Sequence, residues 1–210
     1  MQIFSMKALN RRAEKIPSMI KSLETKYKLV DDLTPYEEKG IFLESTSSMV
    51  FDRVNMIAYI GKSVRTNENL AREWCSKNGF EIVIFETTSH RNNPIYHTDV
   101  LMFVGTDMIG LCDEVINDDY KEEVLSRAQK YHDVMLLTKD QILDFCGNAL
   151  EARNNKDEKY LIMSSRAQKS LTSSQIVKIK KYYKDIIHAD ISTIEKYGGG
   201  SARCMLTELF

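Results

Sequence analysis

The hydrophobic and polar residues follow a pattern that occurs three times after Gly40. The first occurrence predicts two strands joined by a turn at Arg53-Val54-Asn55, then an amphipathic helix, then a β-branched strand. Gly79 is placed to end the helix. The predicted elements cover, in this order, residues 48–52, 55–60, 67–78 and 81–85.

The second and third occurrences have the same order of elements, and the third helix begins with the capping box Thr172-Ser173-Ser174-Gln175. A strand–strand–helix–strand unit of roughly fifty residues cannot bury its hydrophobic face alone. We therefore expect the units to pack side by side around an axis, with loops and strand ends converging at the centre. The second unit is predicted at 100–104, 108–113, 119–131 and 134–137, and the third at 150–153, 160–163, from 172 and through 186–187.

This arrangement is an α/β propeller, and an open doubly wound sheet is the alternative. Separate small sheets would support the propeller, whereas one continuous parallel sheet would support the alternative. The start of the chain is less regular: Ile3, Phe4 and Met6 predict a strand, and Pro17 is placed to begin a helix. We expect one domain over residues 1–210, with a partial unit at 1–40 and complete units at 41–94, 95–146 and 147–210.

Composition and charge limit the classes of partner. The 210 residues are 43% hydrophobic and 28% charged, as in ordinary folded domains. With 29 basic and 30 acidic residues the net charge is -1, which predicts no general attraction to nucleic acid or to a membrane surface. The longest apolar stretch, 100–112, contains Asp107 and is shorter than the ~20 residues of a membrane span. We expect the partner to be a small molecule.

The four cysteines are Cys75, Cys112, Cys146 and Cys204, and no two of them form a C-x-x-C pair. This spacing is typical of a reducing compartment and disfavours both a zinc site and a disulfide framework. We therefore expect a cytoplasmic protein, and we expect no metal or other cofactor.

Cys204 follows three consecutive glycines, Gly198, Gly199 and Gly200. Glycines permit a tight turn and a close approach to a ligand, which would present the thiol at the start of a last strand. The alternative is that Gly198 caps a helix over 191–197 in the left-handed conformation and that Cys204 is a buried thiol. A phosphate-binding loop is disfavoured, because such loops lead from a strand into a helix.

Alignment of the units places an acid, a histidine and a thiol at corresponding positions. Glu44 precedes the first hairpin, His97 precedes the second, and Cys204 precedes the predicted last strand. Asp99 lies on the same side of an extended segment as His97, where it could orient the imidazole or bind substrate. A Cys and a His far apart in sequence form a known nucleophile–base pair. The alternatives are a hydrogen-bonded structural histidine and a solvated loop acid.

Five segments together resemble the amidinotransferase and arginine-deiminase superfamily, the penteins, and within it the citrulline-utilisation hydrolases. The resemblance covers essentially the whole chain and implies a five-bladed α/β propeller with one active site on the axis. It also implies that Cys204 is the nucleophile, His97 the general acid and base, and Glu44 and Asp99 the carboxylates that hold a guanidinium or ureido group. The segments are Phe42-Leu43-Glu44-Ser45-Thr46-Ser47-Ser48-Met49-Val50, Ile95-Tyr96-His97-Thr98-Asp99-Val100, Gly147-Asn148-Ala149-Leu150-Glu151, Met163-Ser164-Ser165-Arg166-Ala167 and Gly198-Gly199-Gly200-Ser201-Ala202-Arg203-Cys204-Met205.

Three further residues of these segments are candidates for substrate binding, namely Ser165, Arg166 and Arg203. Arg203 could bind a substrate α-carboxylate through its planar guanidinium, and the alternative is a surface or sheet-edge charge. The function implied is that of a cysteine-dependent hydrolase or amidinotransferase acting on a citrulline-like or arginine-like compound through a covalent thio-intermediate. A catalytically silent binding or assembly module of the same fold is the alternative.

The chain departs from the family pattern in two places. Members usually have Glu-Gly-Thr-Gly-Ser where this chain has Glu44-Ser45-Thr46-Ser47-Ser48, so a backbone angle suited to glycine would be strained here. The family also carries roughly another hundred residues ahead of Asn10-Arg11-Arg12, or about two of the five blades. We therefore expect an incomplete propeller of about three blades, which self-associates, pairs with a separate N-terminal half, or is marginally stable and inactive.

Overall fold

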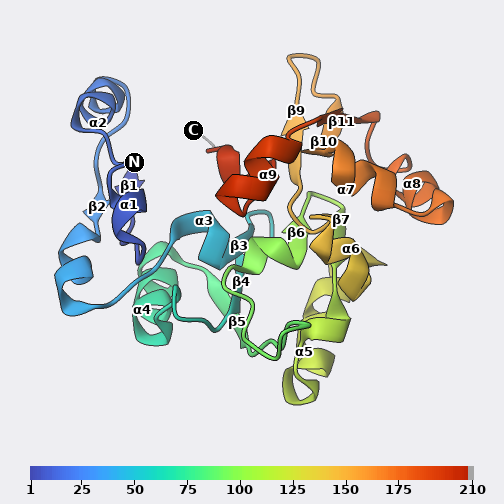
Figure 1. The fold of residues 1–210 in the computed structure, drawn as a ribbon, viewed down its shortest axis with the longest axis horizontal. Coiled ribbons are helices and arrows are strands. Elements are labelled where there is room, and N and C mark those ends of the chain that lie inside the picture. Colours follow the sequence, from blue (N-terminus) through green and yellow to red (C-terminus); the bar gives the residue numbers. More distant parts are fainter. Residues whose placement is uncertain (208–210) are drawn as a thin grey trace.

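Three separate three-stranded sheets follow one another along the chain, and a two-stranded sheet precedes them (Figure 1). The structure, a computed structural model, describes residues 1–207. Because the strands form separate sheets, the strand pairing excludes the doubly wound alternative and confirms the predicted order of strands and helices.

Each of the three sheets contains an antiparallel hairpin and a third strand parallel to the middle one. The parallel strand follows a helix, as a crossover connection requires. The first unit comprises β3 (Met49–Asp52), β4 (Ile57–Gly61), α4 (Glu68–Asn78) and β5 (Glu81–Phe85), the second β6 (Met102–Val104), β7 (Met108–Leu111), α5 (Asp118–Gln129) and β8 (Asp133–Leu136), and the third β9 (Leu150–Arg153), β10 (Lys159–Ser164), α8 (Ser173–Ile179) and β11 (Asp185–Ala189).

Local sequence signals account for the helix ends. The Asn67 side chain accepts a hydrogen bond from the Leu70 backbone at the start of α4, and Gly79 ends this helix with φ of 75°. The predicted capping box of Thr172 and Gln175 is present at the start of α8. These polar contacts satisfy terminal backbone groups that the helices leave unpaired.

Four short helices were not predicted, α1 (Leu9–Arg12), α3 (Ser45–Ser48), α6 (Lys139–Leu143) and α7 (Ser165–Ser170). Each is too short to show a helical period in the sequence. In the N-terminal segment, β1 (Gln2–Ile3) pairs in parallel with β2 (Asp31–Asp32), while α1 (Leu9–Arg12) and α2 (Pro17–Glu24) lie between them. The helix start at Pro17 is therefore confirmed, whereas the strand predicted from Ile3, Phe4 and Met6 is present only at Ile3.

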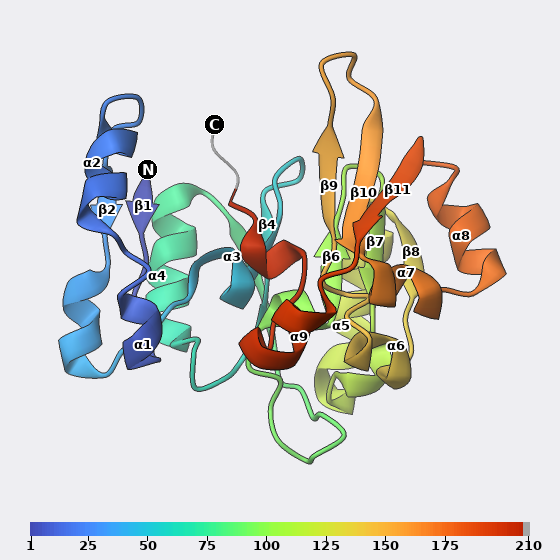
Figure 2. The ribbon, with the colours of Figure 1, turned by 45° about the horizontal axis from the view of Figure 1, so that its top comes forward.

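Two hydrophobic cores hold the units together. The larger joins the second and third sheets and one face of the first, with Tyr59, Phe85 and Phe103 among its buried side chains. The smaller packs Trp74 of α4 against the other face of the first sheet, and Phe4 of the N-terminal segment packs against it. Figure 2 shows the sheets side by side, from β4 to β11.

The first strands of the sheets face one another. A cavity of about 280 Å³ between β3, β6 and β9 includes Asp99 and Arg203 in its lining. The chain returns to this centre at its end through α9 (Ser192–Gly198) and the 3-10 helix η4 (Arg203–Met205), which lie beside the first strands (Figures 1 and 2). None of the helices in residues 1–207 has the length and hydrophobicity of a membrane span.

Candidate active site

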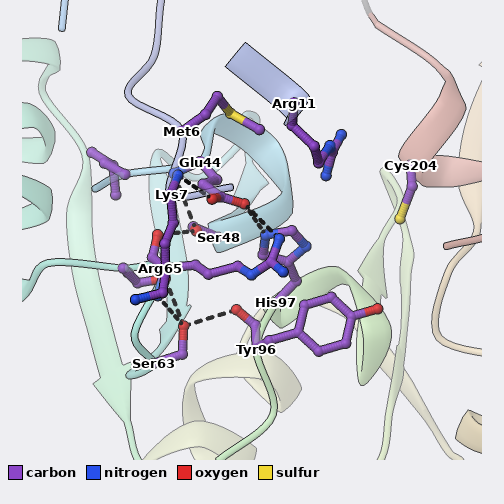
Figure 3. Close-up of polar contacts among 12 residues, drawn as sticks. Met6, Lys7, Arg11, Glu44, Ser48, Ser63, Arg65, Tyr96, His97 and Cys204 are labelled. Carbon is purple, nitrogen blue, oxygen red and sulfur yellow. Dashed lines mark hydrogen bonds and ion pairs between the residues drawn. The ribbon is translucent and has the colours of Figure 1, made fainter. Parts of the chain in front are cut away.

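Glu44 and His97 are buried and hydrogen-bonded to each other (Figure 3). Glu44 precedes the short helix α3 (Ser45–Ser48), and its Oε2 lies 2.6 Å from His97 Nε2. The Lys7 backbone N–H donates to Oε1 at 2.8 Å, and Arg65 Nη1 lies 3.3 Å from Oε2. Both members of the pair are about 2% exposed, so water screens their interaction little.

These partners keep the Glu44 carboxyl ionised. Burial raises the pKa of Glu44, but the hydrogen bonds from His97 and the Lys7 backbone, together with the charges of His97 and Arg65, lower it by more. The pKa therefore lies below its usual value. An ionised Glu44 fixes the orientation of the His97 ring, with Nε2 facing the carboxylate.

The segment that carries His97 is attached firmly to the first sheet. His97 has an extended backbone and precedes the 3-10 helix η2 (Thr98–Val100). The hydroxyl of Thr98 donates to the Ser48 carbonyl at 2.6 Å and accepts from the Gly61 backbone at 2.9 Å. The Tyr96 ring packs against the imidazole at a centroid distance of 4.8 Å. The position of His97 thus depends on both the first and second units.

The thiol of Cys204 lies between a carboxylate and an amide. Its Sγ is 3.4 Å from Asp99 Oδ2 and 3.1 Å from Asn148 Nδ2. Burial, and then the charge of Asp99, raise the pKa of Cys204 to about 11, against hydrogen bonds from the Ser201 backbone and Asn148. A cation bound beside Asp99 would offset both effects and stabilise the thiolate.

The two carboxylate oxygens of Asp99 have different surroundings. Its Oδ2 contacts the thiol, while its Oδ1 is buried and has no hydrogen-bond partner among residues 1–207. Burial raises the pKa of Asp99, and the nearby His97, Cys204 and Arg203 offset only part of that effect. An unpaired buried carboxylate oxygen next to a thiol is suited to accept a hydrogen bond from a substrate nitrogen.

The loop that presents Cys204 turns at glycines. The left-handed residue after α9 is Gly199, with φ of 71°, so the interpretation of Gly198 as the cap is wrong by one residue. A Cβ on Gly200 would lie 3.0 Å from Cys204 Cβ and 3.2 Å from Sγ, so Gly200 permits a close approach. The Tyr96 hydroxyl donates to the Gly199 carbonyl at 2.6 Å and joins this loop to the His97 segment.

Cys204 lies in η4 rather than at the start of a strand, so that prediction is wrong for the residue itself. The last three residues of the predicted unit 147–210, at 208–210, lie outside the described part of the chain.

The structure brings four predicted residues to one centre, places Arg203 with Asp99 in the lining of the central cavity, and places Ser165 and Arg166 apart from it. In Figure 3 His97 and Cys204 lie on opposite sides of a space toward which Arg11 of α1 also points. Ser165 contacts His188 at 2.9 Å, Arg166 pairs with Asp144 at 2.7 Å, and Arg203 Nη1 donates to the Leu206 carbonyl at 3.3 Å. Substrate binding by these three residues stays a prediction.

Residues that the sequence did not single out complete the centre. Asn148, Tyr96 and Arg65 all contact the predicted residues directly. The hydrogen bond to Glu14 raises the pKa of Arg11, burial opposes it, and the negative charges of Glu14, Glu44 and Cys204 add to the rise. The contacts of Asn148, Tyr96 and Arg65 join residues far apart along the chain, so local pattern does not reveal them. The sequence gives one signal, which is that Asn148 and Tyr96 lie inside the segments that resemble the penteins.

Comparisons with known proteins agree with this fold. ArgZ, an arginine dihydrolase from the ornithine–ammonia cycle in cyanobacteria, matches with a TM-score of 0.74 and 14% identity over 99% of this chain and 31% of its own. The N-terminal domain of ArgZ, covalently bound to a reaction intermediate, matches with a TM-score of 0.73 and 14% identity. This match covers 97% of this chain and 68% of that domain's chain. SxtG, an amidinotransferase from Microseira wollei in the saxitoxin biosynthetic pathway, matches with a TM-score of 0.63 and 15% identity. This match covers 97% of this chain and 64% of the SxtG chain. No curated protein sequence matches the chain.

At these identities the solved structures show the fold alone, which is a mixed α/β fold. The chain spans less than a third of ArgZ, at 31%. The sequence model of a family described as N,N-dimethylarginine dimethylhydrolase, eukaryotic, matches residues 1–210. The protein belongs to this family, and the expected membership of the pentein superfamily is confirmed.

Proposed function

We propose that this chain carries the catalytic centre of a cysteine-dependent enzyme that acts on a guanidino or ureido compound through a covalent thio-intermediate. The supporting observation is that one segment, residues 97–99, contacts both a buried carboxylate and the thiol: His97 pairs with Glu44 at 2.6 Å and Asp99 contacts Cys204 at 3.4 Å. The division into a partial unit at 1–40 and units at 41–94, 95–146 and 147–210 around one axis belongs to this proposal.

The first half of the reaction forms a bond from sulfur to carbon. A guanidinium group bound to Asp99 donates hydrogen bonds to the carboxylate and favours loss of the thiol proton. The thiolate adds to the central carbon, and the tetrahedral adduct collapses as the C–N bond breaks. His97, held by Glu44, gives its proton to the leaving amine or ammonia.

The second half releases the product and restores the thiol. His97, now neutral, accepts a proton from water as the water oxygen attacks the same carbon. The C–S bond breaks, sulfur leaves as the thiolate and takes up the second proton of the water, which restores the thiol, and the product carries a carbonyl in place of the lost nitrogen. An amine that enters instead of water would give amidino transfer, so the two reaction types differ only in the second nucleophile.

The substrate class follows from the charges of the site and from the family. Buried Glu44 and Asp99 favour a group rich in N–H donors. The name of the matched family points to dimethylarginine as the first substrate to test. Arginine comes next, because a C264A mutant of AgrE, whose structure matches this fold with a TM-score of 0.74, is complexed with L-arginine, and citrulline follows.

The test is covalent labelling with 2-chloroacetamidine, a cationic alkylating amidine, followed by mass spectrometry of the digested protein. We expect selective labelling of Cys204, because Cys75, Cys112 and Cys146 are at most 1% exposed, whereas Cys204 is half-buried and lies beside the carboxylate of Asp99, which attracts a cation. The neutral 2-chloroacetamide is the matched reagent. Asp99→Asn should remove the preference for the cationic reagent, since it removes the charge that attracts it.

Labelling of Cys204 that does not distinguish the two reagents would instead support the catalytically silent module. Absence of labelling, or equal labelling of all four cysteines, would contradict the assignment of Cys204 as the nucleophile. Assays of amine or ammonia release from dimethylarginine, arginine and citrulline then identify the substrate.

A further inference from the structure

The side chain of Asn148 is completely buried directly behind the thiol. It follows Gly147, where a Cβ would lie 2.4 Å from the Val100 carbonyl oxygen and 2.9 Å from the Met102 backbone nitrogen. The backbone of Gly147 therefore packs against the chain that follows Asp99, and only glycine allows this approach. This contact brings Asn148 from the start of the third unit into the centre.

Every polar atom of the Asn148 side chain has a partner at the centre. Nδ2 donates to the Asp99 backbone carbonyl at 3.0 Å and to Cys204 Sγ at 3.1 Å, and Oδ1 accepts from the Cys204 backbone N–H at 3.3 Å. The orientation of the amide is determined by these partners, because the Asp99 carbonyl can only accept and the Cys204 N–H can only donate.

We propose that Asn148 is a positioning residue that fixes the sulfur of Cys204 and stabilises its thiolate through the side-chain amide. The proposal rests on the proposed function of Cys204 as the nucleophile. The Oδ1 contact holds the backbone of the residue, and the Nδ2 contact holds the sulfur itself. Two contacts from one rigid, buried amide restrict rotation of the thiol toward or away from the substrate carbon.

The chemistry of the amide suits a site for a cationic substrate. A lysine or arginine at this position would stabilise a thiolate more strongly, but its charge would repel a guanidinium group. A neutral N–H donor stabilises the anion without that repulsion, and hydrogen bonds to charged groups are the stronger ones. Asn148 thus opposes the destabilising effects of burial and of Asp99 on the thiolate while leaving the carboxylates free to attract the substrate.

The test measures the rate of alkylation of Cys204 by neutral iodoacetamide as a function of pH, with mass spectrometry to assign the label. Asn148→Leu keeps the shape of the side chain and removes its hydrogen bonds. We expect the midpoint of the pH profile to rise by about one unit, which slows labelling about tenfold below the midpoint. Asn148→Asp keeps the acceptor for the Cys204 N–H but places a carboxylate beside the sulfur, and should raise the midpoint as well.

Gln141→Leu is the control, because it removes the hydrogen bonds of another buried side-chain amide, to the Ser170 carbonyl and to Gln175, without contact to Cys204. It should leave the midpoint unchanged. Circular dichroism and thermal melting establish that each variant is folded, and Asn148→Asp decides the outcome where Asn148→Leu does not fold. An unchanged midpoint in the folded Asn148 variants would overturn the proposal.

This result is separate from the test of the proposed function. Neutral iodoacetamide needs neither turnover nor a guanidinium group, so the Asn148 effect can be present in a protein that shows no preference for chloroacetamidine. Conversely, selective amidine labelling of Cys204 with an unchanged midpoint in the Asn148 variants would leave the enzyme hypothesis in place and remove only the role of Asn148.

Discussion

Ser45, the residue after Glu44, has φ of 53°, in the left-handed region. A side chain in this region costs about 1–2 kcal/mol, because Cβ approaches the following carbonyl oxygen. The sequences that this chain resembles have glycine here, so the strain expected from the sequence is present at Ser45. Ser45 is the first residue of α3, and Glu44 directly before it reaches His97.

We predict that Ser45→Gly stabilises the protein by up to about 1 kcal/mol, because relief of the strain exceeds the added entropy of the unfolded chain. The increase in melting temperature would be about 2–4 °C for a chain of this size. Chemical and thermal unfolding measure both. Thr46→Gly is the control: Thr46 follows in α3 without a positive φ, and its replacement should destabilise the protein by about 0.5 kcal/mol. Equal effects of the two changes would contradict the prediction.

At the scale of elements, the hydrophobic pattern predicted the hairpins and crossover helices well, because each of them buries one face. The strand over 81–85 and the helix over 67–78 lie within one residue of β5 and α4. Helices α1, α3, α6 and α7 could not be predicted, since none of them is long enough to show a helical period. The contact of Asn148 with Cys204 spans 56 positions and that of Tyr96 with Gly199 spans 103, so neither could be predicted from local pattern.

The resemblance to penteins selected Glu44, His97, Asp99 and Cys204, and the structure places these four together. It could not reveal which contacts they make: Glu44 binds His97 directly, whereas Asp99 binds the thiol. The predicted strand start at Cys204 was wrong because the loop after Gly200 closes into a short 3-10 helix. The sequence motifs thus identify which residues form the centre, but which of them contact each other depends on how the units pack together.

The loop between α9 and η4 offers a prediction at this scale. A methyl group on Gly200 would press on Cys204 Cβ and Sγ, at 3.0 and 3.2 Å, and would displace the thiol. We expect Gly200→Ala to slow chloroacetamidine labelling of Cys204 roughly tenfold, since small displacements of a reacting atom reduce rates strongly. Labelling followed by mass spectrometry measures the rate.

Gly198→Ala is the matched change in the same loop. Its Cβ would meet only Ile194 Cγ2, at an ordinary 3.7 Å, and Gly198 is the last residue of α9. It should leave the labelling rate unchanged and stabilise the helix by up to about 1 kcal/mol. A slower reaction in Gly198→Ala, or an unchanged one in Gly200→Ala, would show that the approach of Gly200 to Cys204 does not matter.

At the scale of the whole molecule, each unit covers the third strand of the unit before it. Helix α5 packs against β5, where Arg127 pairs with Glu81. Helix α8 covers β8 in the same way: Lys178 Nζ and Gln175 Nε2 donate to the carbonyls of Val134 and Leu136 at 2.7 and 2.9 Å. The corresponding strand of the third unit, β11, is exposed at four of its five residues, whereas β5 and β8 have one exposed residue each.

We therefore predict that the 210-residue chain, purified alone, associates through the surface of β11. Ile187, in the middle of this strand, is 49% exposed, and an apolar edge strand is a template for pairing with another chain. Light scattering coupled to size-exclusion chromatography over a range of concentrations should give a molar mass above the 24.2 kDa of one chain. Ile187→Lys should return the mass to that of the monomer, because a charged side chain on an edge strand opposes pairing.

Val64→Lys is the control for the added charge, because Val64 is 69% exposed in the loop after β4, on a different unit. It should leave the association unchanged, since the charge lies away from β11. A wild-type chain that remains monomeric at every concentration would show that the exposed face of β11 is tolerated in water. Loss of association in both variants would place the contact elsewhere. Association that only Ile187→Lys abolishes would mean that a second chain occupies the position on β11 that α5 and α8 occupy on β5 and β8.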